Sequence, residues 1–201
     1  PFKIDIRGKG GHAALPEKCI NPIHTASKII EELRVIEKKY NEKERNIVLG
    51  TTAINGGGTT NVIPDKVEMK GICRTYDNKI RTKLKEQLQN KMKEISQKTH
   101  TNIVLKHIEE RPVVVNSQKE TKEIQNIAEK IVGKENIITN YKTMCSEDFS
   151  FFLEKAPGAF VFIGCRQEEY FPQHNENFIV DKESVLLGCQ MMYDIAKKYL
   201  F

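Results

Sequence analysis

The sequence has no apolar run that approaches the roughly 20 residues of a membrane-spanning helix. It also has no Cys-x-x-Cys pair, and its five cysteines are far apart and odd in number. This spacing argues against both a disulfide framework and a zinc knuckle. We therefore expect a protein without a membrane partner in a reducing compartment, with the cytoplasm as the default.

A basic-aromatic strand motif of the kind that binds RNA is also missing. The net charge of +5 is mild, and the lysines are scattered among glutamates along helix-like segments, which is typical of a solvated face. Nucleic acid is therefore not an expected partner. The 201 residues, 39% hydrophobic and 29% charged, suit a globular protein of one large domain or two small ones.

The first half of the sequence shows a β-α-β-β-α-β pattern. Alternating or helical apolar spacing marks strands over residues 2–7, 47–54, 66–73 and 102–108, and helices from about Asn21 and Asn78. Asn21 can cap the first helix, and Pro22 suits its first position. The pattern predicts a ferredoxin-like, four-stranded antiparallel sheet with two helices on one face.

The second half predicts helices over residues 119–132 and 182–199 around one apolar strand, Ala159–Gly164. A lone hydrophobic strand cannot make its own sheet, because both its faces and both its edges need partners. We therefore expect the missing strands to come from an earlier part of a longer chain or from another chain.

His12 ends a glycine-rich corner, Gly8–Gly11, that follows the first strand. Glycine reaches backbone angles that side chains forbid, so such a corner can direct an imidazole away from the fold. Imidazole is the side chain best suited to proton exchange near neutral pH. A tight turn followed by an ordinary surface histidine is the alternative interpretation.

Three other places are candidates for chemistry. Asn61 ends a glycine-rich loop that lacks the Gly-Lys-Ser/Thr ending of a phosphate-binding loop, and the residues alone favour a flexible hairpin loop there. Arg111 lies at a strand exit, where a guanidinium can grip a carboxylate or simply be solvated. His174 lies in a loop beyond the apolar strand, although one histidine alone is weak support for a metal. We interpret the remaining histidines as surface residues: His24, His100 and His107.

Five ordered motifs resemble those of the aminoacylase and carboxypeptidase G family of metallopeptidases. They are Gly8–Ala14, Gly56–Asp65, Gly71–Asp77, Ser146–Ser150 and Pro172–Phe178. The similarity runs along the whole chain. It is strongest to the amidohydrolase branch, which cleaves N-acyl and indoleacetyl amino acids and includes hippurate hydrolase.

The resemblance implies a mixed α/β protein built from two domains. Residues 1–109 would form the lid, an α+β domain that dimerises. Residues 110–201 would form the C-terminal segment of an incomplete three-layer α/β catalytic domain. The N-terminal catalytic segment, which holds most ligands of two divalent metals (zinc, manganese, nickel or cobalt), would be absent. The chain would then be a fragment, or one polypeptide of a cleaved or truncated enzyme, and inactive alone.

The resemblance also implies roles for the four candidate residues. His12 would stabilise the oxyanion in the partner subunit's active site, and Asn61 and Arg111 would bind an N-acyl amino acid or small peptide. His174 would be a metal ligand, with Asn175 orienting nearby groups. Cys145 replaces a usual glycine, where it either narrows the substrate pocket or packs. Glu147 and Asp148 would line the cleft or bond to backbone.

Two functions from other classes compete with the hydrolase. The chain could be a self-sufficient dimerisation module without catalysis, since an edge strand and helix can pair with a copy of themselves. An RNA-binding role for the first half is weaker, because arginine and lysine alternate with acidic residues.

Overall fold

The computed structural model describes every residue except 45, 108–110, 166–170 and 201. The chain forms two compact units. The first contains Pro1–Val113 and Thr143–Glu147, and the second contains Val114–Lys142 and Asp148–Phe201. The boundary between residues 109 and 110 that the resemblance implies lies outside the described residues.

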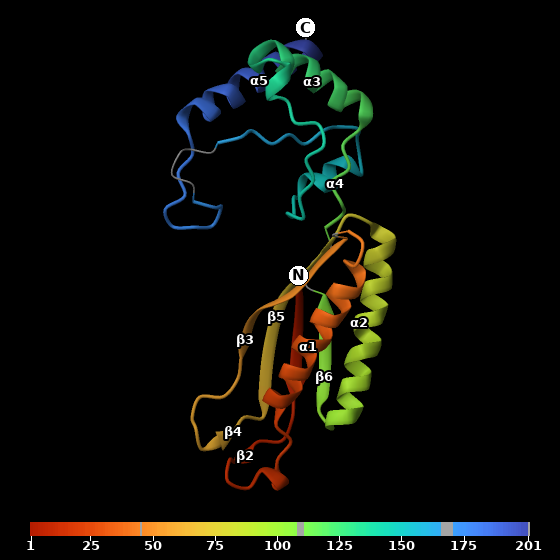
Figure 1. Cartoon of the computed structure of the whole chain (residues 1–201), viewed down its shortest axis with the longest axis vertical. Helices are drawn as coiled ribbons and strands as arrows, with labels where there is room; N and C mark the ends of the chain where they lie inside the picture. Colours follow the sequence, from red (N-terminus) through yellow and green to blue (C-terminus); the bar gives the residue numbers. More distant parts are fainter. Residues whose placement is uncertain (45, 108–110, 166–170, 201) are drawn as a thin grey trace. The chain divides into compact units, whose positions relative to one another are not determined.

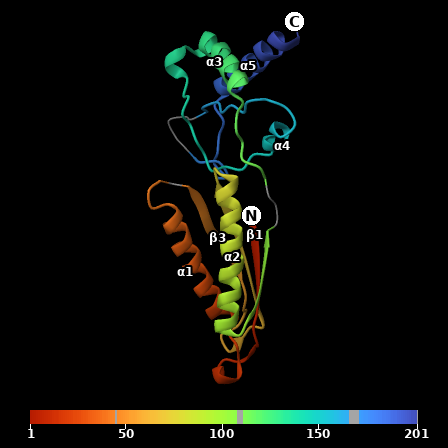
Figure 2. The ribbon, with the colours of Figure 1, turned by 90° about the vertical axis from the view of Figure 1, so that its right-hand side faces the viewer.

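The first unit is built on a four-stranded antiparallel sheet with two helices on one face (Figures 1 and 2). Its main elements in chain order are β1 (Phe2–Arg7), α1 (Pro22–Tyr40), β3 (Ile47–Asn55), β5 (Lys66–Thr75), α2 (Asn78–Thr99) and β6 (Asn102–His107). The strand order is β3-β5-β1-β6, so the first and third main strands lie in the centre. The predicted β-α-β-β-α-β fold is confirmed, although Ile108, expected to end the last strand, lies outside the described residues.

Local signals in the sequence fix where both helices begin. The Asn21 side chain accepts a hydrogen bond from the Ile23 amide at 3.0 Å, and Pro22 occupies the first turn of α1. Asp77 caps α2 in the same way, accepting from the Lys79 amide at 2.6 Å. Each cap satisfies an amide that has no partner within its helix, a contribution of about 1 kcal/mol.

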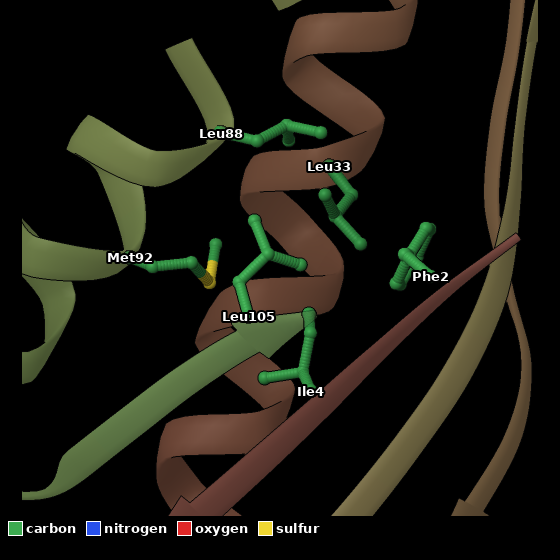
Figure 3. A pocket seen from close by; sticks show the side chains of 6 residues that line it. All are labelled: Phe2, Ile4, Leu33, Leu88, Met92 and Leu105. Carbon is green, nitrogen blue, oxygen red and sulfur yellow. The ribbon is translucent and has the colours of Figure 1, made fainter. Parts of the chain in front are cut away.

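The core of the first unit lies between the helices and the sheet. Figure 3 shows side chains from four elements converging there: Phe2 and Ile4 from β1, Leu33 from α1, Leu88 and Met92 from α2, and Leu105 from β6. Phe2, Ile4 and Ile6 are buried while Lys3 and Asp5 lie on the other face, as the period of two requires. Burying each such apolar side chain contributes about 1.5–3 kcal/mol.

A second, two-stranded sheet continues from one end of the main sheet. It pairs β2 (Gly11–His12) with β4 (Val62–Ile63), close to the end where Arg7 pairs with Lys66 (Figure 1). A short 3₁₀ helix, η1 (Pro16–Lys18), follows β2. We call residues 8–20 and 61–65 together the β2–β4 tip.

The second unit is mainly helical in its described residues. Its elements are α3 (Gln118–Val132), the 3₁₀ helix η2 (Lys134–Asn136), α4 (Phe149–Leu153) and α5 (Lys182–Leu200). Phe160 lies at the middle of an aromatic chain, with ring centroids 5.6 Å from Phe149 and 5.1 Å from Phe162. In the described part of the chain, no helix is both long enough and apolar enough to cross a membrane.

The predicted buried strand Ala159–Gly164 is wrong for this structure. The segment forms no regular strand, and Val161 and Phe162 are 42% and 53% exposed. The Asn116 side chain bonds one edge, accepting from the Phe160 amide at 2.8 Å and donating to the Phe160 carbonyl at 2.9 Å. A strand needs a ladder along its length, and no described residue of this unit supplies one.

Candidate functional site

The β2–β4 tip brings together two of the four predicted site residues. His12 pairs with Val62 across the two-stranded sheet, and the Ala13 amide donates to the Asn61 carbonyl at 3.0 Å. His12 and Asn61 are both exposed, although they lie far apart in the sequence. The strand pairing therefore presents an imidazole and a side-chain amide to solvent from adjacent chain segments.

The His12 ring is held in a defined orientation by its own turn. The Ala14 amide donates to His12 Nδ1 at 3.1 Å, and the Leu15 amide donates to the His12 carbonyl at 2.9 Å. Because Nδ1 acts as an acceptor, the hydrogen of the neutral ring lies on Nε2. No described residue accepts a hydrogen bond from Nε2, so this atom can donate to a bound molecule.

The glycines before His12 serve a different purpose from the one predicted. Gly57 and Gly133 are the described glycines with positive φ, so Gly8, Gly10 and Gly11 do not need unusual backbone angles. They are needed for close approach. A Cβ would lie 2.0 Å from the Ile20 carbonyl oxygen at Gly8, 2.7 Å from the Ile63 carbonyl oxygen at Gly10, and 2.7 Å from Cys19 Sγ at Gly11.

Asp65 is a site residue that sequence reasoning missed. Its Oδ1 accepts from the Gly10 amide at 2.8 Å, and its carbonyl accepts from the Gly8 amide at 2.9 Å. One signal in the sequence could have drawn attention to it. Pro64 has no amide hydrogen and interrupts a strand ladder, and the carboxylate directly after it can accept from an amide of the facing segment.

Arg111 lies away from His12 within the first unit. It follows β6 at the end of the sheet where Phe2 pairs with His107, whereas His12 follows the other end of β1. Arg111 is half-buried, and its carbonyl accepts from Arg81 Nη1 at 2.8 Å. The structure therefore does not bring Arg111 and His12 of the same chain together. The neighbouring Glu109 and Glu110 lie outside the described residues.

His174 occupies an exposed turn in the second unit with a φ of 71°. Hydrogen bonds on either side close the turn, from the Asn175 amide to the Pro172 carbonyl and from the Phe178 amide to the Asn175 carbonyl. A left-handed backbone at a non-glycine residue costs about 1 kcal/mol or more and is found often at functional sites. Among the residues that the structure describes, no group of three or more histidine, cysteine or acidic side chains could hold a metal.

The segment around Cys145 forms no metal cluster with the other residues that the structure describes. Cys145 is exposed, and its amide donates to Thr143 Oγ1 at 3.2 Å. Glu147 is half-buried and Asp148 is exposed. All five cysteines are free thiols.

A cluster of ion pairs lies on the open face of the sheet. Lys3 Nζ lies 2.5 Å from Glu68 Oε2, and Lys66 Nζ lies 3.0 Å from Asp5 Oδ1. The hydrogen bond from Lys66 lowers the pKa of Asp5, and the hydrogen bond from Lys3 lowers the pKa of Glu68. The positive charges of these lysines neutralise the negative charges of the carboxylates, as is typical of a solvent-exposed face.

Comparison with known proteins shows what the chain resembles. Residues 2–100 match the model of a peptidase dimerisation domain. The chain is 32% identical to thermostable carboxypeptidase 2 of Saccharolobus solfataricus, over 98% of this chain and 51% of that protein. It is also 32% identical to N-acetyl-L-cysteine deacetylase of Bacillus subtilis, over 99% of this chain and 47% of that protein.

A solved structure matches this chain over nearly its whole length. The Bacillus subtilis YXEP protein, described as a dinuclear metal binding peptidase from the M20 family, superposes with a TM-score of 0.71 at 26% identity. The match covers 97% of this chain and 48% of that one. The chain thus spans about half the length of the curated relatives that it matches.

Proposed function

Since this chain belongs to the M20 family of peptidases, we propose that the full-length protein is a dinuclear metal-dependent amidohydrolase. It cleaves the amide bond of N-acyl amino acids or short peptides. Residues 1–109 act as the lid, through which two copies form a homodimer, and residues 110–201 complete the catalytic domain. The deacetylase and carboxypeptidase names of the relatives support this substrate class.

The observation on which the proposal rests is the exposed imidazole of the β2–β4 tip. His12 has its Nδ1 occupied by the Ala14 amide, which leaves Nε2–H as a donor that points to no described residue. Such a donor stabilises the oxyanion that develops when water attacks an amide carbonyl. Because Arg111 and His12 of one chain lie at opposite ends of the sheet, we propose that His12 acts in the active site of the partner subunit.

The substrate contacts follow from the same arrangement. Asn61, beside His12, holds the substrate near its carbonyl or carboxylate, and Arg111 binds the terminal carboxylate. All five cysteines are unpaired, which supports a reducing, cytoplasmic location.

His174 is the residue of this chain that we assign to the metal centre. Its imidazole is exposed on a closed turn, as an accessible ligand must be, and zinc, manganese, nickel and cobalt all accept imidazole. When bound, divalent ions polarise a carbonyl and activate water. One imidazole does not make a metal site, so the described residues fit such a centre only in part.

Replacing His12 tests the proposal. In the full-length protein, His12→Ala lowers kcat for hippurate about 100-fold to 1,000-fold, the usual cost of removing one oxyanion donor. Metal content measured by mass spectrometry stays unchanged. His24→Ala is the matched control, because His24 is also an exposed histidine of the first unit and lies on α1. A His12→Ala enzyme that hydrolyses hippurate at the wild-type rate would refute the assignment.

A dimerisation module without catalysis is the second candidate, favoured by the match of residues 2–100 to a dimerisation domain. It predicts that the 201-residue chain sediments as a dimer and that the full-length protein hydrolyses no N-acyl amino acid. Hydrolysis of hippurate by the full-length protein would exclude this candidate.

A further inference from the structure

We propose that Asp65 is the positioning residue of His12, because it closes a one-residue bulge that turns the imidazole outward. The inference concerns the geometry of this chain, and its importance for catalysis rests on the function proposed for His12.

The bulge lies between the two sheets of the first unit. β1 and β5 pair as far as Arg7 and Lys66, and pairing resumes at Gly11 and Ile63. Residues 8–10 therefore face residues 64 and 65, so one segment contains one residue more than the other. This is the residue count of a β-bulge.

The extra residue decides which face His12 occupies. On the Lys66 side, Val67 and Ile63 are both buried, whereas Asp65 between them is exposed and bonds the Gly10 amide. On the other side, Ile6 is buried, yet Gly11 faces inward opposite Ile63 and His12 is exposed. The even-numbered residues of β1 face inward, so His12 would also face inward if that alternation continued. The one-residue shift therefore exchanges the faces and places the imidazole in solvent.

Hydrogen bonds hold the bulged segment on both edges. On one edge, Lys9 and Ile20 exchange amide–carbonyl bonds of 2.9 Å in both directions. On the other edge, the Gly8 amide donates to the Asp65 carbonyl at 2.9 Å, and the Gly10 amide donates to Asp65 Oδ1 at 2.8 Å. Pro64 has no amide hydrogen and interrupts the ladder at this point, and the carboxylate of Asp65 supplies the acceptor for the Gly10 amide.

The hydrogen bond between the Gly10 amide and Asp65 requires a residue without a Cβ at position 10. A Cβ at Gly10 would lie 3.0 Å from both Cγ and Oδ1 of Asp65, so any side chain would push the carboxylate away. Without the carboxylate, the Gly10 amide loses its acceptor and the bulge can relax. Since His12 is two residues away, we expect the ring to move, and a displacement of about 1 Å can cost about 100-fold in rate.

The experiment compares four variants. In the full-length enzyme, Asp65→Ala lowers kcat for hippurate about 10-fold to 100-fold with KM within about twofold. Asp65→Asn keeps an oxygen acceptor and retains kcat within about threefold. Glu17→Ala removes an exposed acidic residue of the β2–β4 tip and is the matched control. In the His12→Ala background, Asp65→Ala has no further effect, because it acts through that ring.

A second measurement, by NMR, reports the environment of the His12 imidazole directly. In the 201-residue chain, Asp65→Ala shifts the imidazole nitrogen resonances of His12 and the amide resonance of Gly10 by NMR, whereas Glu17→Ala and Asp65→Asn leave the His12 nitrogens in place. Unchanged His12 resonances in Asp65→Ala would overturn the positioning role. A wild-type kcat of Asp65→Ala would also overturn it, if His12→Ala is impaired. Wild-type activity of His12→Ala would overturn the function proposed for His12 but not the positioning role of Asp65, because the NMR measurement tests that role without any activity assay.

Discussion

Gly8→Ala is the substitution that the geometry of the β2–β4 tip tolerates least. A Cβ at Gly8 would lie 2.0 Å from the Ile20 carbonyl oxygen and 3.0 Å from Pro22 Cδ. The first contact is to backbone, which cannot rotate away as a side chain can. Either Ile20 or Gly8 must therefore shift, and the two-way pairing of Lys9 with Ile20 breaks.

The expected cost follows from these contacts. Losing both Lys9–Ile20 hydrogen bonds removes about 2 kcal/mol, at about 1 kcal/mol for each bond. The steric overlap adds about 1–3 kcal/mol. We therefore expect the free energy of unfolding to fall by about 3–5 kcal/mol, with His12 displaced at the same time.

Gly58→Ala is the matched control. An added Cβ at Gly58 meets no atom within 4 Å, and Gly58 does not have positive φ. Its free energy of unfolding should change by less than about 1 kcal/mol, with either sign. Urea unfolding of the 201-residue chain measures both variants, and hydrogen exchange of the Lys9 and Ile20 amides localises the damage. Equal urea midpoints and equal exchange rates for Gly8→Ala and Gly58→Ala would refute the close-approach argument.

Two further predictions concern charge and metal. Lys91 and Lys98, each 2.7 Å from the Glu94 carboxylate, lower the pKa of Glu94 from 4.5 to about 2. The lowered pKa stabilises the folded state above pH 4.5, and this contribution is lost as the pH falls toward 2. The difference in urea midpoint between wild type and Glu94→Gln should therefore shrink over that range, and a constant difference would contradict the ion pairs. His174→Ala should lower the metal content of the full-length protein while its unfolding temperature without metal is unchanged; unaltered metal content would remove His174 from the ligand set.

The sheet and helices of the first unit could be predicted because their signals are local. Asn21 and Pro22 mark the start of α1, and the apolar spacing of α1, α2 and β1 specifies their buried faces. The order of the strands follows from the β-α-β-β-α-β pattern, since such a chain has few ways to cover one face of a sheet with two helices. Each of these features depends on residues close together in the sequence.

The features that the sequence did not predict depend on contacts between distant segments. Ala159–Gly164 has the composition of a strand, but a strand forms only where another segment offers a ladder, and Asn116 bonds one edge alone. The Gly8–Gly11 corner is explained by the closeness of Ile20, Cys19 and Ile63, which no local pattern shows. Asp65 was missed for the same reason, because its partners Gly8 and Gly10 lie in a distant segment, between β1 and β2.

A heterodimer tests most directly whether His12 serves the partner subunit. One subunit of the full-length protein has His12→Ala and the other has His174→Ala, with different affinity tags so that the mixed dimer can be purified. If His12 acts across the interface, one site of the mixed dimer combines an intact His12 with an intact His174. The account predicts about half of the wild-type rate of hippurate hydrolysis, although each parent homodimer is nearly inactive. A mixed dimer as inactive as its parents would contradict it.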